Sequence, residues 1–108
     1  MFNRLRAKII KFMYKDILGK KCIVRSYDAG VYFGTVTKVA GETVRVENVR
    51  NIWRWEGASC LSQIANDGIR DGNVSQVVGS MVLNRCCQII PCTDKAITNL
   101  EGQRVWKY

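Results

Sequence analysis

The stretch Val44–Gly68 places the tightest constraint on the fold, because it passes from strand to helix around two tryptophans. Side chains alternate between the two faces of a strand, so Trp53 and Trp55 are predicted to project to the same side. Gly57 interrupts the strand, and Ala58–Ala65 has the apolar spacing of a short helix. Two indoles are large apolar surfaces for a small core. The sequence therefore predicts a sheet built around this aromatic strand.

Alternating apolar and polar residues predict further strands before and after this stretch. The expected strands are residues 21–27, 31–39, 43–49, 77–83 and 85–90. Gly34 predicts a bulge or a close approach between strands, and Thr93 or Asp94 is expected to cap a last helix. The predicted fold class is α+β: an antiparallel sheet of about five strands with a basic N-terminal helix and one or two short helices.

Residues 1–20 are predicted to form the basic amphipathic helix, and residues 21–108 a single small α+β domain. The net charge of +8 is concentrated at this end, because residues 1–21 carry seven Lys or Arg against one Asp. A stripe formed by Arg4, Lys8, Lys11 and Lys15 could bind nucleic acid, a membrane surface or an acidic partner. The alternative is a solvated face of a helix that packs its other side on the sheet.

Composition favours a binding protein over an enzyme. The chain has no histidine, so the commonest proton shuttle is missing, and its acidic residues are scattered singly. Its five cysteines show no disulfide framework and no C-x-x-C pair, which favours buried, reduced thiols over a zinc site. No metal and no cofactor is predicted. No apolar run approaches the roughly 20 residues of a membrane span.

Aromatic and basic side chains interleave across the neighbouring predicted strands, which indicates a binding site. The predicted ligand-binding residues are Arg25, Tyr27, Tyr32, Arg50, Trp53, Arg54 and Trp55. Flat rings stack on bases, and arginine forks bind phosphates with two hydrogen bonds. The alternative is that the indoles belong to the core and the arginines are charges at its rim.

The polar segment Asn66–Ser75 is predicted to be a flexible loop that borders the site. Its glycines and acidic residues offer little apolar surface, so ordering it would cost about 1–2 kcal/mol per residue in backbone entropy. A ligand or a neighbouring subunit could offset that cost and close the loop as a lid. A mobile surface turn without function is the alternative.

Two segments resemble a family of small bacteriophage proteins that carry a domain of unknown function. They are Arg25–Thr35 (RSYDAGVYFGT) and Arg50–Ala58 (RNIWRWEGA), and LSQIA at 61–65, IIPCT at 89–93 and a late Trp106 add to the likeness. The resemblance covers roughly residues 21–107. The basic segment before it lies outside the shared pattern. The family supplies no catalytic residues to transfer.

The resemblance implies a viral or prophage protein that acts in the cytoplasm of a bacterial host. Such accessory proteins often bind host factors or sequester nucleotide immune signals, so we expect a counter-defence protein that sequesters a small phosphorylated ligand without catalysis. The alternative is an inhibitor that binds nucleic acid or a host protein through the basic N-terminal helix. Homo-oligomerisation is expected, because a small sheet has edges and apolar faces to cover.

Overall fold

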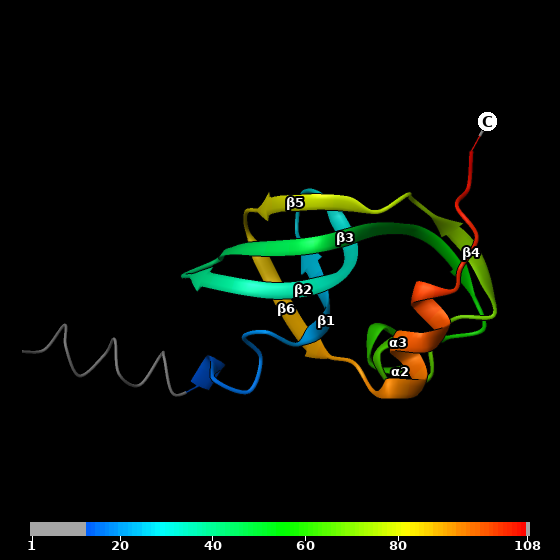
Figure 1. Ribbon diagram of the computed structural model, residues 1–108, viewed down its shortest axis with the longest axis horizontal. Coiled ribbons are helices and arrows are strands. Elements are labelled where there is room, and N and C mark those ends of the chain that lie inside the picture. Colours follow the sequence, from blue (N-terminus) through cyan, green and yellow to red (C-terminus); the bar gives the residue numbers. More distant parts are fainter. Residues whose placement is uncertain (1–12, 108) are drawn as a thin grey trace, which may run out of the picture.

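β3 (Thr43–Glu56) is the longest strand, and the other strands are arranged around it. In the computed structural model, which describes residues 13–107, β2 (Gly30–Ala40) pairs with one side of β3. On the other side β5 (Val78–Leu83) pairs with the first half of β3, and β4 (Asp71–Val74) pairs with the second half. Figure 1 shows β3 curving away from β5 to reach β4.

β1 (Lys21–Ser26) and β6 (Cys86–Pro91) complete a six-stranded sheet in which every strand pair is antiparallel. The order is β4-β3-β2-β1-β6, and β5 joins through β3. In Figure 1, β1 and β6 cross behind β2 and β3, so the sheet is strongly bent. Bending allows one sheet to bury apolar side chains on both of its faces.

The two faces of the sheet form two separate core clusters. Because neighbouring residues of a strand point to opposite faces, Ile23 enters one cluster while Cys22 and Val24 enter the other. The first cluster also contains Phe33, Ile52, Ile64 and Leu100, and so joins the sheet to the helices. The second cluster consists almost entirely of strand residues, among them Tyr32, Val36, Val44, Val46, Val49 and Leu83.

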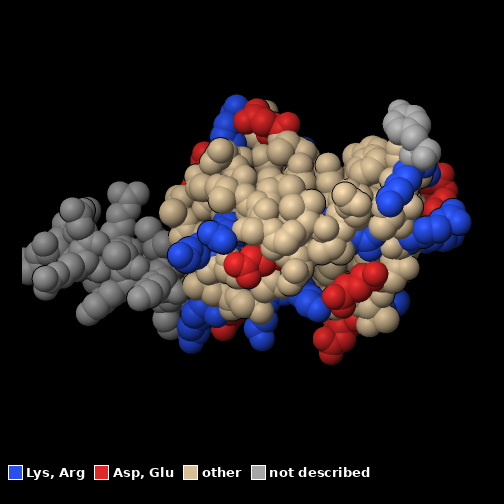
Figure 2. Space-filling view, turned by 45° about the horizontal axis from the view of Figure 1, so that its top comes forward, with Lys and Arg blue, Asp and Glu red and all other residues tan. Residues whose placement is uncertain are grey.

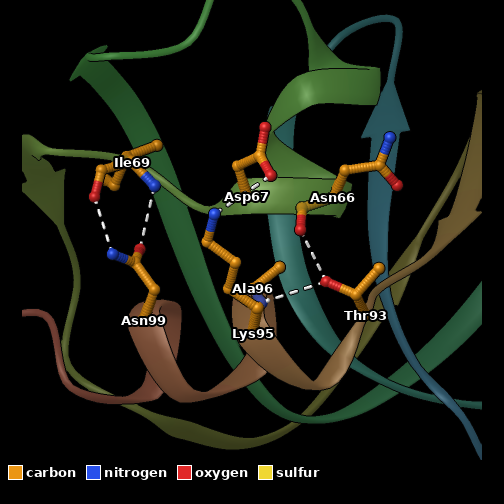
Figure 3. Close-up of polar contacts among 7 residues, drawn as sticks. All are labelled: Asn66, Asp67, Ile69, Thr93, Lys95, Ala96 and Asn99. Atoms are coloured by element: carbon orange, nitrogen blue, oxygen red, sulfur yellow. Dashed lines mark hydrogen bonds and ion pairs between the residues drawn. The ribbon is translucent and has the colours of Figure 1, made fainter.

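Two short helices, α2 (Leu61–Asp67) and α3 (Asp94–Glu101), pack on the first cluster and on each other. Figure 3 shows the polar contacts between them. The Thr93 hydroxyl accepts from Ala96 N–H as the predicted cap and donates to the Asn66 carbonyl at 2.6 Å. Lys95 and Asp67 form an ion pair at 3.3 Å. No helix within residues 13–107 is long and apolar enough to cross a membrane.

The prediction for Gly34 is confirmed, because β2 and β3 approach each other closely at this position. A Cβ on Gly34 would lie 2.6 Å from Val46 Cγ1 and 3.0 Å from the Glu47 carbonyl oxygen. The pairing register shifts at the same place, where Phe33 opposes Arg50 but Thr35 opposes Glu47. Asn48, with a φ of 50°, belongs to the bulge on β3.

The predicted α+β fold class is wrong. Two short helices and an antiparallel sheet are present, but the sheet has six strands rather than about five and is bent around two cores. The predicted basic N-terminal helix falls largely on residues 1–12, outside the described residues. Where it was expected to continue, residues 15–19 form turns, and the amides of Ile17 and Leu18 donate to the Tyr14 carbonyl.

The segment Asn66–Ser75 is not the predicted loop. It contains the end of α2 and the whole of β4, and it buries Ile69 and Val74. Asn99 of α3 holds Ile69 through two backbone contacts, accepting from its N–H and donating to its carbonyl, each at 2.8 Å (Figure 3). These contacts compensate the ordering cost that favoured a flexible loop, so the lid is not supported.

Candidate functional site

Two of the predicted ligand residues, Arg50 and Tyr32, lie inside the protein. Only 4% of Arg50 is exposed, and its guanidinium donates to backbone carbonyls of Ser75, Leu100, Glu101 and Gln103 at 2.8–3.4 Å. Burial lowers the pKa of Arg50, but a guanidinium still stays charged at any ordinary pH. Tyr32 packs in the second core cluster. Arg50 therefore joins β3 to the end of α3.

A bulge at Trp53 separates the two indoles of β3. Ile52 pairs with Val74 and Arg54 pairs with Asn73, so β3 has one extra residue between them. In a regular strand, residues three positions apart project to opposite faces. Because of the bulge, Ile52 and Trp55 instead contact the same core cluster. Trp53 instead meets Trp106 edge to face, with ring centroids 5.7 Å apart. The prediction that both indoles serve one side of the sheet is therefore wrong.

Arg54 lies in a cavity of about 420 Å³ beside β4 and the chain that follows α3, which we call the Arg54 cavity. Its lining residues are Arg54, Asp71, Gly72, Asn73, Gln103, Arg104, Val105, Trp106 and Lys107. Val105 forms a parallel bridge with Val74, and the Trp106 amide donates to the Val74 carbonyl, so this last segment is held against β4. The cavity has three basic side chains and one carboxylate, a net positive charge.

The Arg54 guanidinium is held in place by its neighbours. Its Nε and Nη2 each lie 3.3 Å from Asn73 Oδ1, and its Nη1 lies 3.3 Å from Glu56 Oε1. Within residues 13–107, the side chains of Arg104 and Lys107 make no hydrogen bond or ion pair. The cavity thus combines one positioned guanidinium with two basic groups that are available to an anion.

Arg25 and Trp55 line a different cavity, of about 380 Å³, which we call the Arg25 cavity. It shares no lining residue with the Arg54 cavity. Tyr27 lies in neither: it is 72% exposed, and the Arg85 guanidinium lies 5.0 Å from the centre of its ring. Arg85 also pairs with Asp28 at 3.0 Å. The structure therefore divides the predicted ligand residues among several environments.

The sequence-based prediction missed Arg104 and Lys107, which line the Arg54 cavity. The signal was present, because Arg104, Trp106 and Lys107 interleave basic and aromatic side chains as the residues near Trp53 do. The alternative partner-binding residues Arg4, Lys8 and Lys11 lie outside the described residues. Lys15 lies in the turns before β1.

The cysteines are only partly the buried thiols that were predicted. Burial raises the pKa of Cys22 to about 11 and that of Cys92 to about 12. Cys60 and Cys87 are exposed. Hydrogen bonds from the Gln63 backbone N–H and the Ser59 hydroxyl lower the pKa of Cys60. Within residues 13–107 no three His, Cys, Asp or Glu side chains gather as metal ligands.

Comparison with known proteins supplies a family and a fold. The sequence matches the family model described as "Domain of unknown function (DUF6948)" over residues 19–100. No curated protein matches it. The crystal structure of a heptameric archaeal Sm protein, described with its implications for the eukaryotic snRNP core, is similar to that of this chain. The TM-score is 0.52 and the sequence identity is 20%. The alignment covers 76% of this chain and 98% of that one.

At 20% identity this likeness shows the fold alone. The bent antiparallel sheet is Sm-like, and this replaces the α+β class predicted from the sequence. The family match agrees with the resemblance to proteins that carry a domain of unknown function.

Proposed function

Because the chain belongs to the DUF6948 family, whose function is unknown, we propose a function from its own site: it binds a small phosphorylated ligand of nucleotide type without catalysis. The observation that carries the proposal is the Arg54 cavity, where three basic side chains meet an indole in about 420 Å³. This volume is within the range of small-molecule sites.

The chemistry of the cavity suits a base joined to phosphate. Trp106 is 42% exposed and braced edge to face by Trp53, so its ring offers a stacking surface to a base. Arg54 presents its guanidinium in a fixed orientation, and Arg104 and Lys107 add positive charge for phosphate oxygens. Asp71 is an acceptor for sugar hydroxyls or an amino group.

Calorimetry with cyclic mononucleotides, cyclic dinucleotides and ADP-ribose tests this proposal. We expect at least one of them to bind. When the protein is heated to release this ligand, the ligand should be recovered chemically unchanged. Arg104→Gln and Lys107→Gln should each weaken binding about three- to tenfold, because each removes one charge-assisted contact at a partly exposed site. Arg45→Gln is the matched control, since Arg45 is exposed, pairs with Glu47 and lies outside the cavity.

Two further outcomes separate this proposal from its alternatives. A variant with Arg4, Lys8, Lys11 and Lys15 changed to Gln should keep the ligand, whereas an inhibitor that acts through the basic segment should lose its nucleic-acid or protein partner. If none of the nucleotides produces heat, or if Arg104→Gln and Lys107→Gln bind as the wild type does, ligand binding in the Arg54 cavity is contradicted.

We further propose that the protein acts in counter-defence in the cytoplasm of a bacterial host, as its resemblance to phage proteins implies. A protein that sequesters a nucleotide immune signal needs affinity and abundance but no catalytic group. The lack of histidine and the cluster of basic and aromatic side chains support that role.

We also propose that the protein forms homo-oligomers through β5. Among the described strands, β5 pairs only with β3, and it exposes Val78 and Val82. Figure 2, in which the top of Figure 1 comes forward, shows a broad uncharged surface on this side. An unpaired strand edge with exposed apolar side chains can pair with the same edge or another edge of a second chain. The structurally similar Sm protein is heptameric, which also supports self-association.

Val82→Lys is expected to turn the oligomer into a monomer in sedimentation velocity, because the charge would be desolvated at a paired edge. Thr98→Lys on the exposed side of α3 adds the same charge away from β5 and should leave the oligomer intact. A wild-type protein that sediments as a monomer at high micromolar concentration would contradict self-association.

A further inference from the structure

The Arg25 cavity lies at the rim of the first core cluster, where the sheet meets the start of α2. It is lined by Arg25, Val31, Trp55, Cys60, Leu61, Ser62 and Gln88. Val31, Trp55 and Leu61 belong to or pack against that core cluster. The cavity is therefore an open continuation of the apolar interior, with polar side chains at its mouth.

The strand register brings one row of side chains across the cavity. Arg25 of β1 lies directly opposite Val31 of β2 and opposite Gln88 of β6. Directly opposed residues of antiparallel strands project to the same face, so Arg25 stands in one row between Gln88 and the apolar Val31. Three strands thus fix the spacing of this row.

The floor of the cavity is rigid. Trp55 Nε1 donates to the Ala58 carbonyl at 3.2 Å, and the ring packs against the core cluster that holds Ile52 and Ile64. Leu61, in the first turn of α2, extends the apolar surface. A flat apolar ligand can therefore contact an indole that is already oriented, which reduces the entropy lost on binding.

The polar groups at the mouth have unused hydrogen-bonding capacity. Within residues 13–107, the side chains of Arg25, Gln88 and Ser62 form no hydrogen bond or ion pair with the protein. In contrast, the guanidinium of Arg50 is occupied by backbone carbonyls, and that of Arg54 already has protein partners on each of its nitrogens. The Arg25 cavity thus has one free cation and two further polar side chains above an apolar floor.

We propose that this cavity is a second ligand site, separate from the Arg54 cavity, for a small organic carboxylate with a flat apolar body. Arg25 binds the carboxylate as a two-pronged donor, Gln88 adds an amide N–H, and the body of the ligand lies on Trp55 and Leu61. A single cation matches a monoanion, whereas the three basic groups of the other cavity match phosphates.

Naphthalene-2-carboxylate is a suitable probe, and NMR of the three tryptophan indole N–H groups is the readout. We expect the Trp55 signal to shift and saturate with a Kd on the order of 1 mM, as is typical for a ligand of this size. The signals of Trp53 and Trp106 should stay in place. Naphthalene-2-carboxamide, which has the same body without the charge, should bind about fivefold or more weakly.

Arg25→Gln should lower the affinity for the carboxylate but not for the carboxamide. The two compounds should then bind this variant with the same affinity. Arg45→Gln, another exposed strand arginine, should bind both compounds as the wild type does. The proposal is overturned if carboxylate and carboxamide shift Trp55 equally in the wild type. It is also overturned if only Trp53 or Trp106 responds, or if Trp55 does not respond at all.

Discussion

Arg50→Met is expected to lower the free energy of unfolding by about 3–5 kcal/mol in urea denaturation. Methionine keeps much of the volume of the arginine stem but removes every donor. The carbonyls of Ser75, Leu100 and Gln103 would then lose their partner, and each unsatisfied buried acceptor costs about 1–3 kcal/mol. Native packing between β3 and α3 would also weaken.

Arg45→Met separates this effect from the general loss of an arginine. Arg45 is exposed on the same strand, and within residues 13–107 its side chain pairs only with Glu47, at 3.6 Å. Its replacement should therefore change stability by less than about 1 kcal/mol. Arg50→Lys should remain strongly destabilised, because one ammonium group cannot reach carbonyls that the guanidinium fork spans. An Arg50→Met protein as stable as Arg45→Met would contradict this role.

Gly72→Ala is expected to cost about 2–3 kcal/mol and to weaken ligand binding in the Arg54 cavity. A Cβ at this position would lie 2.4 Å from the Arg54 carbonyl oxygen and 3.1 Å from Trp55 Cα. Backbone atoms cannot rotate away as a side chain can, so β4 must move from β3. Because Gly72 and Arg54 both line the cavity, its shape would change with the strand spacing.

Gly79→Ala is the matched control, because apart from the adjacent residues no atom of residues 13–107 lies within 4 Å of a Cβ built on Gly79 in β5. Alanine there should be neutral or stabilising by up to about 1 kcal/mol, since it reduces the entropy of the unfolded chain. Thermal unfolding of both variants measures the difference. Equal melting temperatures for the two variants would show that β3 and β4 can separate at little cost.

Local chemistry explains which parts of the fold could be predicted. The meander of β1, β2 and β3 follows from alternating apolar residues, and Gly34 indicated the close approach of strands. Thr93 and Asp94 were the two candidates for the helix cap, because an oxygen beside the first turn satisfies a free amide, and the structure selects Thr93. Each of these signals lies within a few residues of the structure that it predicts.

β4 and the curvature of β3 could not be predicted in this way. β4 buries only Val74, and its other residues are types that usually form turns. β4 pairs with β3 and, through Val74, with Val105 after α3, and Asn99 of α3 holds Ile69 just before the strand. Val105 and Asn99 are distant from β4 in the sequence. The bulge at Trp53 reverses the alternation on which the placement of Trp55 depended.

The candidate site was only partly predictable for a related reason. Arg50 was predicted to be a ligand residue because it lies near the two tryptophans in the sequence, and burial was not expected because a charged side chain is rarely buried. Its actual partners are backbone carbonyls, and these leave no trace in a sequence. Arg54 was correctly placed on the aromatic strand, but Arg104 and Lys107 reach the same cavity only because the segment after α3 returns to β4.

The bonds of Arg50 have a consequence for how the protein is made. Gln103, which accepts from Arg50, is added to the growing chain 53 residues later, which takes about 3–10 s at ordinary rates of synthesis. Until then the guanidinium must remain in water, and during that interval β3 cannot pack against α3. The strand therefore stays exposed on the growing chain, where chaperones can bind it and proteases can cleave it.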